Sequence, residues 1–227
     1  MKTRLTTGLK ISVCMATRGF VCRVFAAAVY LLFFSCLLAN AQTPIHPDGV
    51  AQAGAAALKD FLPALDSPVM KKTHGFAADD DLSDVTLGQP FESRYLIPDA
   101  AKKYVKDARV EEFLAESRTW FFPVISKGTQ ACLLSVIHRQ DGSFQKDKLG
   151  MAQLARVWAA VIDAWPAEKG YMPLLVIVPS HQRFYFTVPQ AQPPNLTRIS
   201  IEQADQASPK LFKKLTPADE AFAELRD

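Results

Sequence analysis

Cys132 and His138 are the first two residues whose types could do chemistry together. A thiolate and an imidazole base are the reacting groups of thiol hydrolases, and Cys132 is the only cysteine after residue 41. The segment 130–138 has the pattern of a β-strand. Six residues of strand span about 20 Å at about 3.3 Å each, whereas a nucleophile and its base must come within about 3 Å. His138 therefore does not serve Cys132, and we expect Cys132 to be a buried side chain in a central strand.

A second group of polar residues lies in a late hairpin. His181 falls at a turn, and after it Arg183, Tyr185 and Thr187 alternate with apolar residues. This period of two places the polar side chains on the face opposite the apolar ones. Arginine suits carboxylates and tyrosine suits interfaces. We predict that His181, Arg183 and Tyr185 bind an anionic or peptide partner; the alternative is a solvated sheet face.

The residue types that bind metals are dispersed. The chain has no HExxH and no CxxC motif. The acidic loop 79–84 is not an EF-hand, because Asp84 and Pro90 stand where that motif needs glycine and glutamate. The signatures of serine hydrolases, phosphate-binding loops and dinucleotide folds are also missing. We therefore expect no metal and no cofactor and assign no catalytic residue, while a carboxylate pair that meets only in the fold stays open.

Residues 1–41 have the pattern of an export signal. A basic stretch without acidic residues precedes the apolar run 25–38, and the small residues of Ala39-Asn40-Ala41 follow. Fourteen apolar residues are fewer than the roughly 20 that cross a bilayer. We predict cleavage between Ala41 and Gln42 and a periplasmic or extracellular location, with an uncleaved anchor as the alternative. Translation from Met15 would give a leader of ordinary length.

Removal of this leader changes the net charge of the protein. The chain has 26 basic and 23 acidic residues, and the leader contains five basic and no acidic ones. The remainder has 21 basic and 23 acidic residues, a net charge of −2. Nucleic-acid binding needs a positive surface, so we expect no nucleic-acid partner. Cys132 is left alone, and therefore we expect no disulfide.

The periodicity of the chain predicts its elements. An apolar stripe after Asp48, which would cap it, indicates a short helix that ends near Pro63, and residues 66–84 read as a polar linker. Residues 100–117 after Asp99 are typical of one or two helices. The strongest helical pattern covers 151–165. Strands are expected at 95–97, 119–126, 130–138, 144–148, 173–178, 183–188 and 197–201, and Pro123 predicts an edge or a bulge.

These elements indicate an α+β fold. We expect a mostly antiparallel sheet of five to six strands, one long amphipathic helix across it and an N-terminal helical segment. The order of elements is similar to that of profilin-like and PAS-like ligand-binding domains and, more loosely, of the cystatin-like class. The predicted divisions are an N-terminal segment 42–84, a single domain 85–205 and a polar C-terminal tail 206–227.

The functional expectation is a non-enzymatic exported domain that binds a small ligand or another protein. Its partner would be an exported protein or a small anionic or peptide ligand, and the membrane would be involved only through an uncleaved leader. The first alternative is a small exported hydrolase that uses Cys132 or a dispersed acid/base pair. The second is a protease inhibitor or a secretion chaperone.

Overall fold

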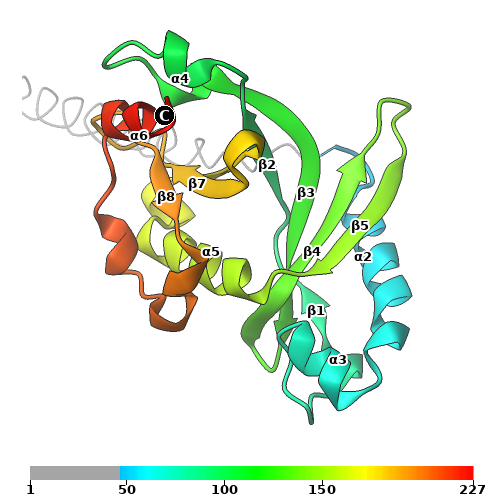
Figure 1. Ribbon diagram of the computed structural model, residues 1–227. Coiled ribbons are helices and arrows are strands. Elements are labelled where there is room, and N and C mark those ends of the chain that lie inside the picture. Colours follow the sequence, from blue (N-terminus) through cyan, green and yellow to red (C-terminus); the bar gives the residue numbers. More distant parts are fainter. Residues whose placement is uncertain (1–46, 227) are drawn as a thin grey trace, which may run out of the picture. The chain divides into compact units, whose positions relative to one another are not determined.

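The computed structural model describes residues 47–226, so the predicted leader, its cleavage point and Met15 lie outside the described residues. The described part contains an eight-stranded sheet in the order β5-β4-β3-β2-β6-β7-β8, with β1 paired to β3 (Figure 1). The strands are β1 (Thr86–Leu87), β2 (Phe91–Leu96), β3 (Leu114–Ser126), β4 (Thr129–His138), β5 (Phe144–Gly150), β6 (Leu174–Val178), β7 (Arg183–Thr187) and β8 (Thr197–Ile199).

The predicted α+β class and the mostly antiparallel sheet are confirmed. Of the described strand pairs only β2 and β6 run parallel, and this pair joins the antiparallel part β5-β4-β3-β2 to the antiparallel part β6-β7-β8. The expected five or six strands were too few. The α-helices are α2 (Val50–Phe61), α3 (Pro68–Thr73), α4 (Ala100–Lys103), α5 (Ala152–Ala164) and α6 (Ala218–Glu224). No helix among the described residues is long and apolar enough to span a bilayer.

The predicted hairpin of β3 and β4 is present, and both of its strands have a neighbour on each side in the sheet. Its turn places Lys127 at φ 50° and Gly128 at φ 75°, the two positive φ values that a tight hairpin turn requires. β4 is covered on both faces: Leu133 on one side and Cys132 on the other are both 0% exposed. Because side chains alternate along a strand, β4 contributes side chains to two separate cores, one on each face of the sheet.

Pro123 does not lie on an edge strand, so of the two alternatives predicted for it, an edge or a bulge, the edge is wrong. β3 pairs with β4 on one side and with both β1 and β2 on the other. Pro123 falls opposite the break between β1 and β2, where its carbonyl accepts a hydrogen bond from the amide of Gly88. The missing N–H of proline is tolerated at such a break. The predicted bulge is present next to it, between Val124 and Ile125.

Residues 100–117 form two short helical turns and not one long helix, and they are not α-helical beyond Lys103. α4 is a single turn, the 3-10 helix η3 covers Val110–Phe113, and β3 begins at Leu114. Asp99 has φ 61° and no side-chain capping bond. The apolar residues that disturb the helical stripe belong instead to a strand start, where Leu114 pairs with Leu96. Tertiary pairing here overrides helix propensity.

The N-terminal helix is confirmed, but its start differs from the prediction. Gly49, at φ 90°, is the N-cap of α2, and no side chain caps this end, so Asp48 has no capping role. Gly54, which weakens the helical pattern, has a packing reason. A Cβ at this position would lie 2.5 Å from the ring of Phe122, so only glycine lets the helix approach β3.

The predicted polar linker 66–84 and the predicted polar C-terminal tail 206–227 both contribute side chains to the core. In 66–84 the chain forms α3 and the 3-10 helix η2 (Leu82–Asp84), and Phe76 is 4% exposed. In 206–227 the described residues form the 3-10 helix η7 (Leu211–Lys213) and α6, where Phe212 and Phe222 are buried. A few large apolar residues in these polar segments are enough to fix them to the sheet.

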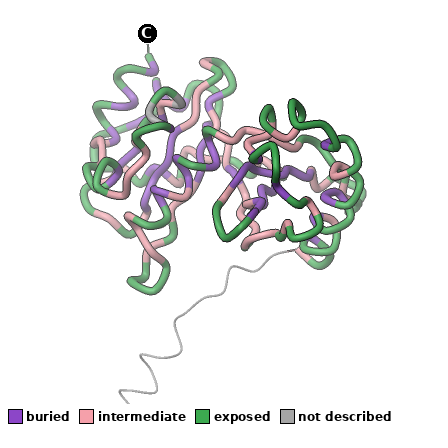
Figure 2. The backbone as a smooth tube through the Cα atoms, turned by 90° about the horizontal axis from the view of Figure 1, so that it is seen from below, coloured by how far each residue is buried: buried purple, intermediate pink, exposed green. Residues whose placement is uncertain are grey.

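The two faces of the sheet have different covers. α5 lies on one face with η6 (Ile201–Gln206) and η7, over a core that includes Leu133, Leu175 and Phe186. On the other face, α2 covers β3, β4 and β5, and α4 with α6 covers β6 and β7. Figure 2 shows the buried residues in the interior of the described part and the exposed ones around its outside. We call these faces the α5 face and the opposite face.

Candidate functional site

The predicted binding residues of the late hairpin do not form a common surface. His181 ends the 3-10 helix η5 (Pro179–His181), and its Nδ1 lies 2.9 Å from the hydroxyl of Ser180. Arg183 begins β7 and is half-buried. Tyr185 is 0% exposed, and its hydroxyl has no hydrogen-bond partner among the described residues. Thr187 is 1% exposed. A second helical layer covers this face of β7, which excludes a solvated sheet face there.

Cys132 is sealed on the opposite face, between β4 and α2. The side chain is 0% exposed. Burial raises the pKa of its thiol to about 12, and the backbone N–H of Gly150 opposes this shift only in part. Since the thiolate is the reactive form, the site lacks the positive, accessible surroundings of catalytic cysteines.

The acidic loop is held by structural contacts. Lys127 Nζ lies 2.9 Å from a carboxylate oxygen of Asp80, whose other oxygen accepts a hydrogen bond from the amide of Ala77. Asp81 accepts from the amide of Ser83 and caps η2. In the described part of the chain, no three acidic, histidine or cysteine residues are grouped as a metal site would need.

A charged cluster lies on the opposite face of β2 and β3. The guanidinium of Arg94 is 3.1 Å from Glu92 and 3.6 Å from Glu116. Desolvation raises the pKa of Glu92, and the charges of Arg94 and His138 offset this only in part. The ring of His138 stacks on Phe144 at 4.7 Å. The sequence did not single out Glu92, because three separate strands bring these groups together.

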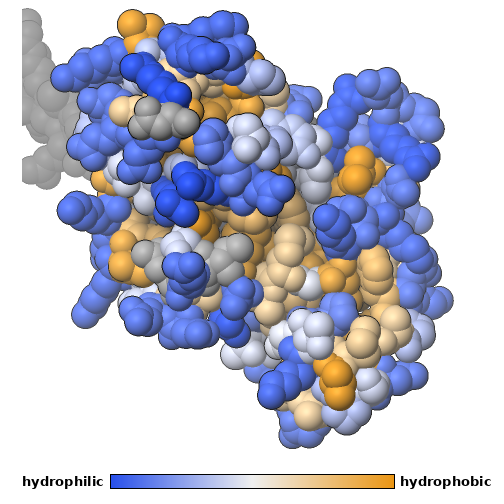
Figure 3. Space-filling model, in the orientation of Figure 1, coloured by the Kyte–Doolittle hydropathy of each residue, from blue (hydrophilic) through white to orange (hydrophobic). Residues whose placement is uncertain are grey.

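The α5 face carries an open pocket of about 410 Å³ between α3, the start of α5 and β7. This volume is within the range of small-molecule sites, about 300–1,000 Å³. Figure 3 shows apolar residues gathered in the middle of this face, with hydrophilic side chains around them. The pocket is lined by Lys72, Thr73, Gly75, Met151, Ala152, Gln153, Leu154, Arg156 and Phe184.

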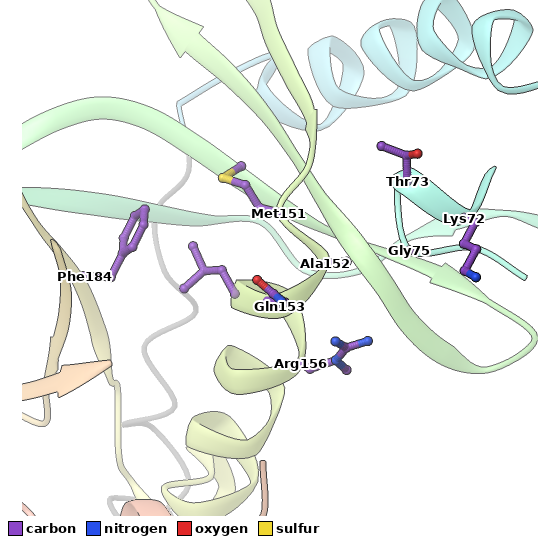
Figure 4. Close-up of a pocket in the computed structure, with 9 residues that line it drawn as sticks. Lys72, Thr73, Gly75, Met151, Ala152, Gln153, Arg156 and Phe184 are labelled. Atoms are coloured by element: carbon purple, nitrogen blue, oxygen red, sulfur yellow. The ribbon is translucent and has the colours of Figure 1, made fainter. Parts of the chain in front are cut away.

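The two ends of the pocket differ in chemistry. Met151, Leu154 and Phe184 belong to the apolar core of the α5 face, which continues to the stacked rings of Phe91 and Trp158, 4.8 Å apart. In Figure 4 the Phe184 ring lies at one end of the pocket, and the cationic groups of Lys72 and Arg156 lie at the other. None of the nine lining residues is acidic.

Close backbone packing fixes the walls of this pocket. Gly75 has φ 92°, and a Cβ there would lie 2.6 Å from the Cβ of Ala152 and would also meet the carbonyl of Ala131. Only glycine therefore holds the end of α3 against α5 and β4. Met151 is the N-cap of α5 at φ 57°, and no side chain caps this helix end. The turn from β5 into α5 thus directs Met151 toward the pocket (Figure 4).

The residues of this pocket were interpreted differently from the sequence. Met151 and Leu154 belong to the predicted helix 151–165, and Phe184 is one of the apolar residues that alternate in the late hairpin; of the three only Leu154 is buried. Lys72 lay in the supposed polar linker. The one available signal was the pair Gly150-Met151 before the strongest helix, but residue types alone do not place α3 beside it.

Comparison with known proteins finds no matching family model, no similar curated protein and no similar solved structure.

Proposed function

We propose that the protein is an exported, non-enzymatic domain that binds a ligand in the pocket of the α5 face. The observation that carries this proposal is the pocket itself: an open cavity of about 410 Å³ whose lining combines the apolar side chains of Met151, Leu154 and Phe184 with polar and cationic groups. Small-molecule sites generally have volumes in this range. The similarity in element order to PAS-like and profilin-like domains belongs to the same proposal, since it rests on the order alone.

The proposal places the binding site next to the residues predicted from the sequence. Phe184 lies between Arg183 and Tyr185 on β7, and its side chain points to the α5 face, where theirs do not. We keep His181 and Arg183 as residues that could contact a larger partner, such as a peptide. Tyr185 contributes to this proposal only as a support for β7, because its side chain is buried.

Binding is tested with N-phenyl-1-naphthylamine, a neutral probe that becomes fluorescent in apolar pockets. We expect saturable binding to the purified protein and a clear loss of affinity in Met151→Ala and Phe184→Ala. Met172→Ala is the matched control, because Met172 is 39% exposed and does not line the pocket. Absence of saturable binding, or an equal loss in the control, would refute the site.

Export is tested separately from binding. We expect cell fractionation to recover the protein in the periplasm or the medium, with Gln42 as its N-terminal residue. For the unprocessed precursor we expect a start at Met15, and a peptide that covers residues 2–10 would exclude this start. Recovery only in the membrane would favour the uncleaved anchor.

A protein partner would make the domain a protease inhibitor or a secretion chaperone. Capture of partners from the exported fraction, followed by mass spectrometry, distinguishes these from small-ligand binding. Competition is the decisive readout: a partner that binds through the pocket must be displaced by the neutral probe, and must lose affinity in Phe184→Ala.

One observation favours the hydrolase alternative. Glu92 is half-buried with a raised pKa and lies beside Arg94, and perturbed carboxylates are candidates for acid/base roles. This alternative predicts turnover of chromogenic ester or glycoside substrates that is lost in Glu92→Gln. Equal turnover by both proteins would reject it. The version through Cys132 has little support, because that thiol is sealed from solvent.

A further inference from the structure

The rim of the pocket has an excess of positive charge. Lys72 and Arg156 are both exposed, and no acidic side chain lines the cavity. Among the described residues, no carboxylate lies within ion-pair distance of Lys72, whereas Arg156 has a single acidic neighbour. A ligand with a negative group would therefore find one free cation and one that is already paired.

The neighbour of Arg156 is Asp205, at 3.4 Å. Asp205 belongs to η6, which packs on α5, and its side chain is 87% exposed. An exposed pair of this kind contributes little to stability, so a ligand carboxylate can replace Asp205 at small cost. Asp205 thus acts as an internal competitor, one that marks Arg156 as a group able to bind a carboxylate.

At the end of the pocket lined by Phe184, Met151 and Leu154, a charged group would pay a desolvation cost. Phe184 and Met151 are half-buried, and Leu154 is 2% exposed. They are continuous with the apolar core under α5. A polar group placed there would lose its hydration without a compensating hydrogen bond, so this end suits an apolar body.

We propose that the ligand is a small amphiphilic anion, with a carboxylate at Lys72 and Arg156 and an apolar body against Met151 and Phe184. This inference rests on the proposed ligand-binding function and specifies its ligand class. The volume of the pocket, about 410 Å³, favours a small molecule over an extended peptide. A medium-chain carboxylate such as decanoate has the required chemistry.

The test uses three probes that share one apolar chain: decanoate, 1-decanol and decyltrimethylammonium. Each displaces N-phenyl-1-naphthylamine from the purified protein, so one assay measures all three affinities. We expect decanoate to bind about tenfold more tightly than decyltrimethylammonium, with 1-decanol between them, since hydrogen bonds that involve a charged group are about twice as strong as neutral ones.

Three variants assign the head group to its site. In the double variant of Lys72→Gln and Arg156→Gln, we expect decanoate to lose about five- to tenfold in affinity and 1-decanol to be unchanged. In Asp205→Asn we expect decanoate to gain about two- to threefold, because its competitor is gone. Lys169→Gln, an exposed cation that does not line the pocket, is the control and should bind all probes as the wild type does.

The possible failures are distinguishable. If the neutral probe binds but decanoate is no better than decyltrimethylammonium, the ligand class is wrong and the binding function stands. If decanoate is preferred but the double variant keeps that preference, the anion binds elsewhere and this site is overturned. If the neutral probe does not bind, the proposed function fails, and this inference fails with it.

Discussion

The two faces of the sheet differ in how completely helices cover them. On the opposite face, α2, α4 and α6 cover the strands so closely that Cys132 and Tyr185 are both fully buried. On the α5 face, the cover ends at the start of α5 and leaves an open pocket lined by methionine, phenylalanine and two cations. Cys132 and Tyr185 are closed off from solvent on the opposite face, whereas the side chains that line the pocket can be reached from solvent. Access, and not residue type, separates the two.

The largest effect that we predict for the opposite face is on the reaction rate of the Cys132 thiol. A rise of the thiol pKa from 9.0 to about 12 lowers the thiolate fraction at pH 8 about 1,000-fold. We expect at least that reduction in the rate with a thiol reagent, and full reaction after denaturation. Ser180→Cys in the Cys132→Ala background supplies an exposed thiol for comparison. Equal rates for the two thiols would mean that the opposite face is open.

The raised pKa of Cys132 also fixes the sign of a pH effect. The neutral thiol is favoured in the fold, so its contribution is fully present below pH 9 and is lost as the pH rises toward 12. We expect the free energy of unfolding to fall less steeply with pH in Cys132→Ala than in the wild type between these values. Parallel pH profiles in denaturant titrations would contradict the burial of the thiol.

Phe222→Ala tests whether the C-terminal segment seals the opposite face. Phe222 is 0% exposed and stacks on Tyr104 at a centroid distance of 4.1 Å. We expect a loss of about 3–5 kcal/mol in the free energy of unfolding, measured by chemical denaturation. Leu211→Ala, 43% exposed in the same segment, should lose much less. Equally small losses of unfolding free energy in both variants would mean that residues 206–227 are a tail that does not stabilise the domain.

The fold was predictable where local patterns and tertiary pairing agree. The β3–β4 hairpin and α5 follow from their periodicity and turn residues, and both were identified. The segment 100–117 was not, because its helical propensity is opposed by the pairing of Leu114 with Leu96 across 18 residues of sequence. Likewise, no local sequence pattern predicts that Lys72 and Phe184, which are far apart in the chain, line one pocket.

Gly54→Ala measures how tightly α2 is seated on the opposite face. At an exposed helical position this change would stabilise the protein by about 0.5–1 kcal/mol. Here the new methyl group meets the ring of Phe122 at 2.5 Å, so we expect a loss of about 1–3 kcal/mol. Ala55→Gly, on the exposed side of the same helix, is the control and should cost about 0.5–1 kcal/mol. A gain for Gly54→Ala would show a loose α2.

Tyr185→Phe should give the smallest change in the free energy of unfolding. This change should be opposite in sign to that of its control. The Tyr185 hydroxyl is buried and has no hydrogen-bond partner in the described part of the chain, so its removal should raise the free energy of unfolding by about 1 kcal/mol. Tyr104 lies in the same core, but its hydroxyl donates to the carbonyl of Ala108 at 3.3 Å. We expect Tyr104→Phe to lose about 1 kcal/mol. A loss for Tyr185→Phe would mean that its hydroxyl has a partner.

The most direct test of the central claim, that ligands enter from the α5 face, is a map of amide chemical shifts during titration with decanoate. The account predicts saturable shifts confined to the end of α3, the first turn of α5 and β7 around Phe184, including Gly75 and Ala152. Shifts that cluster instead around Cys132 and Tyr185, or a spectrum that does not change, would contradict it.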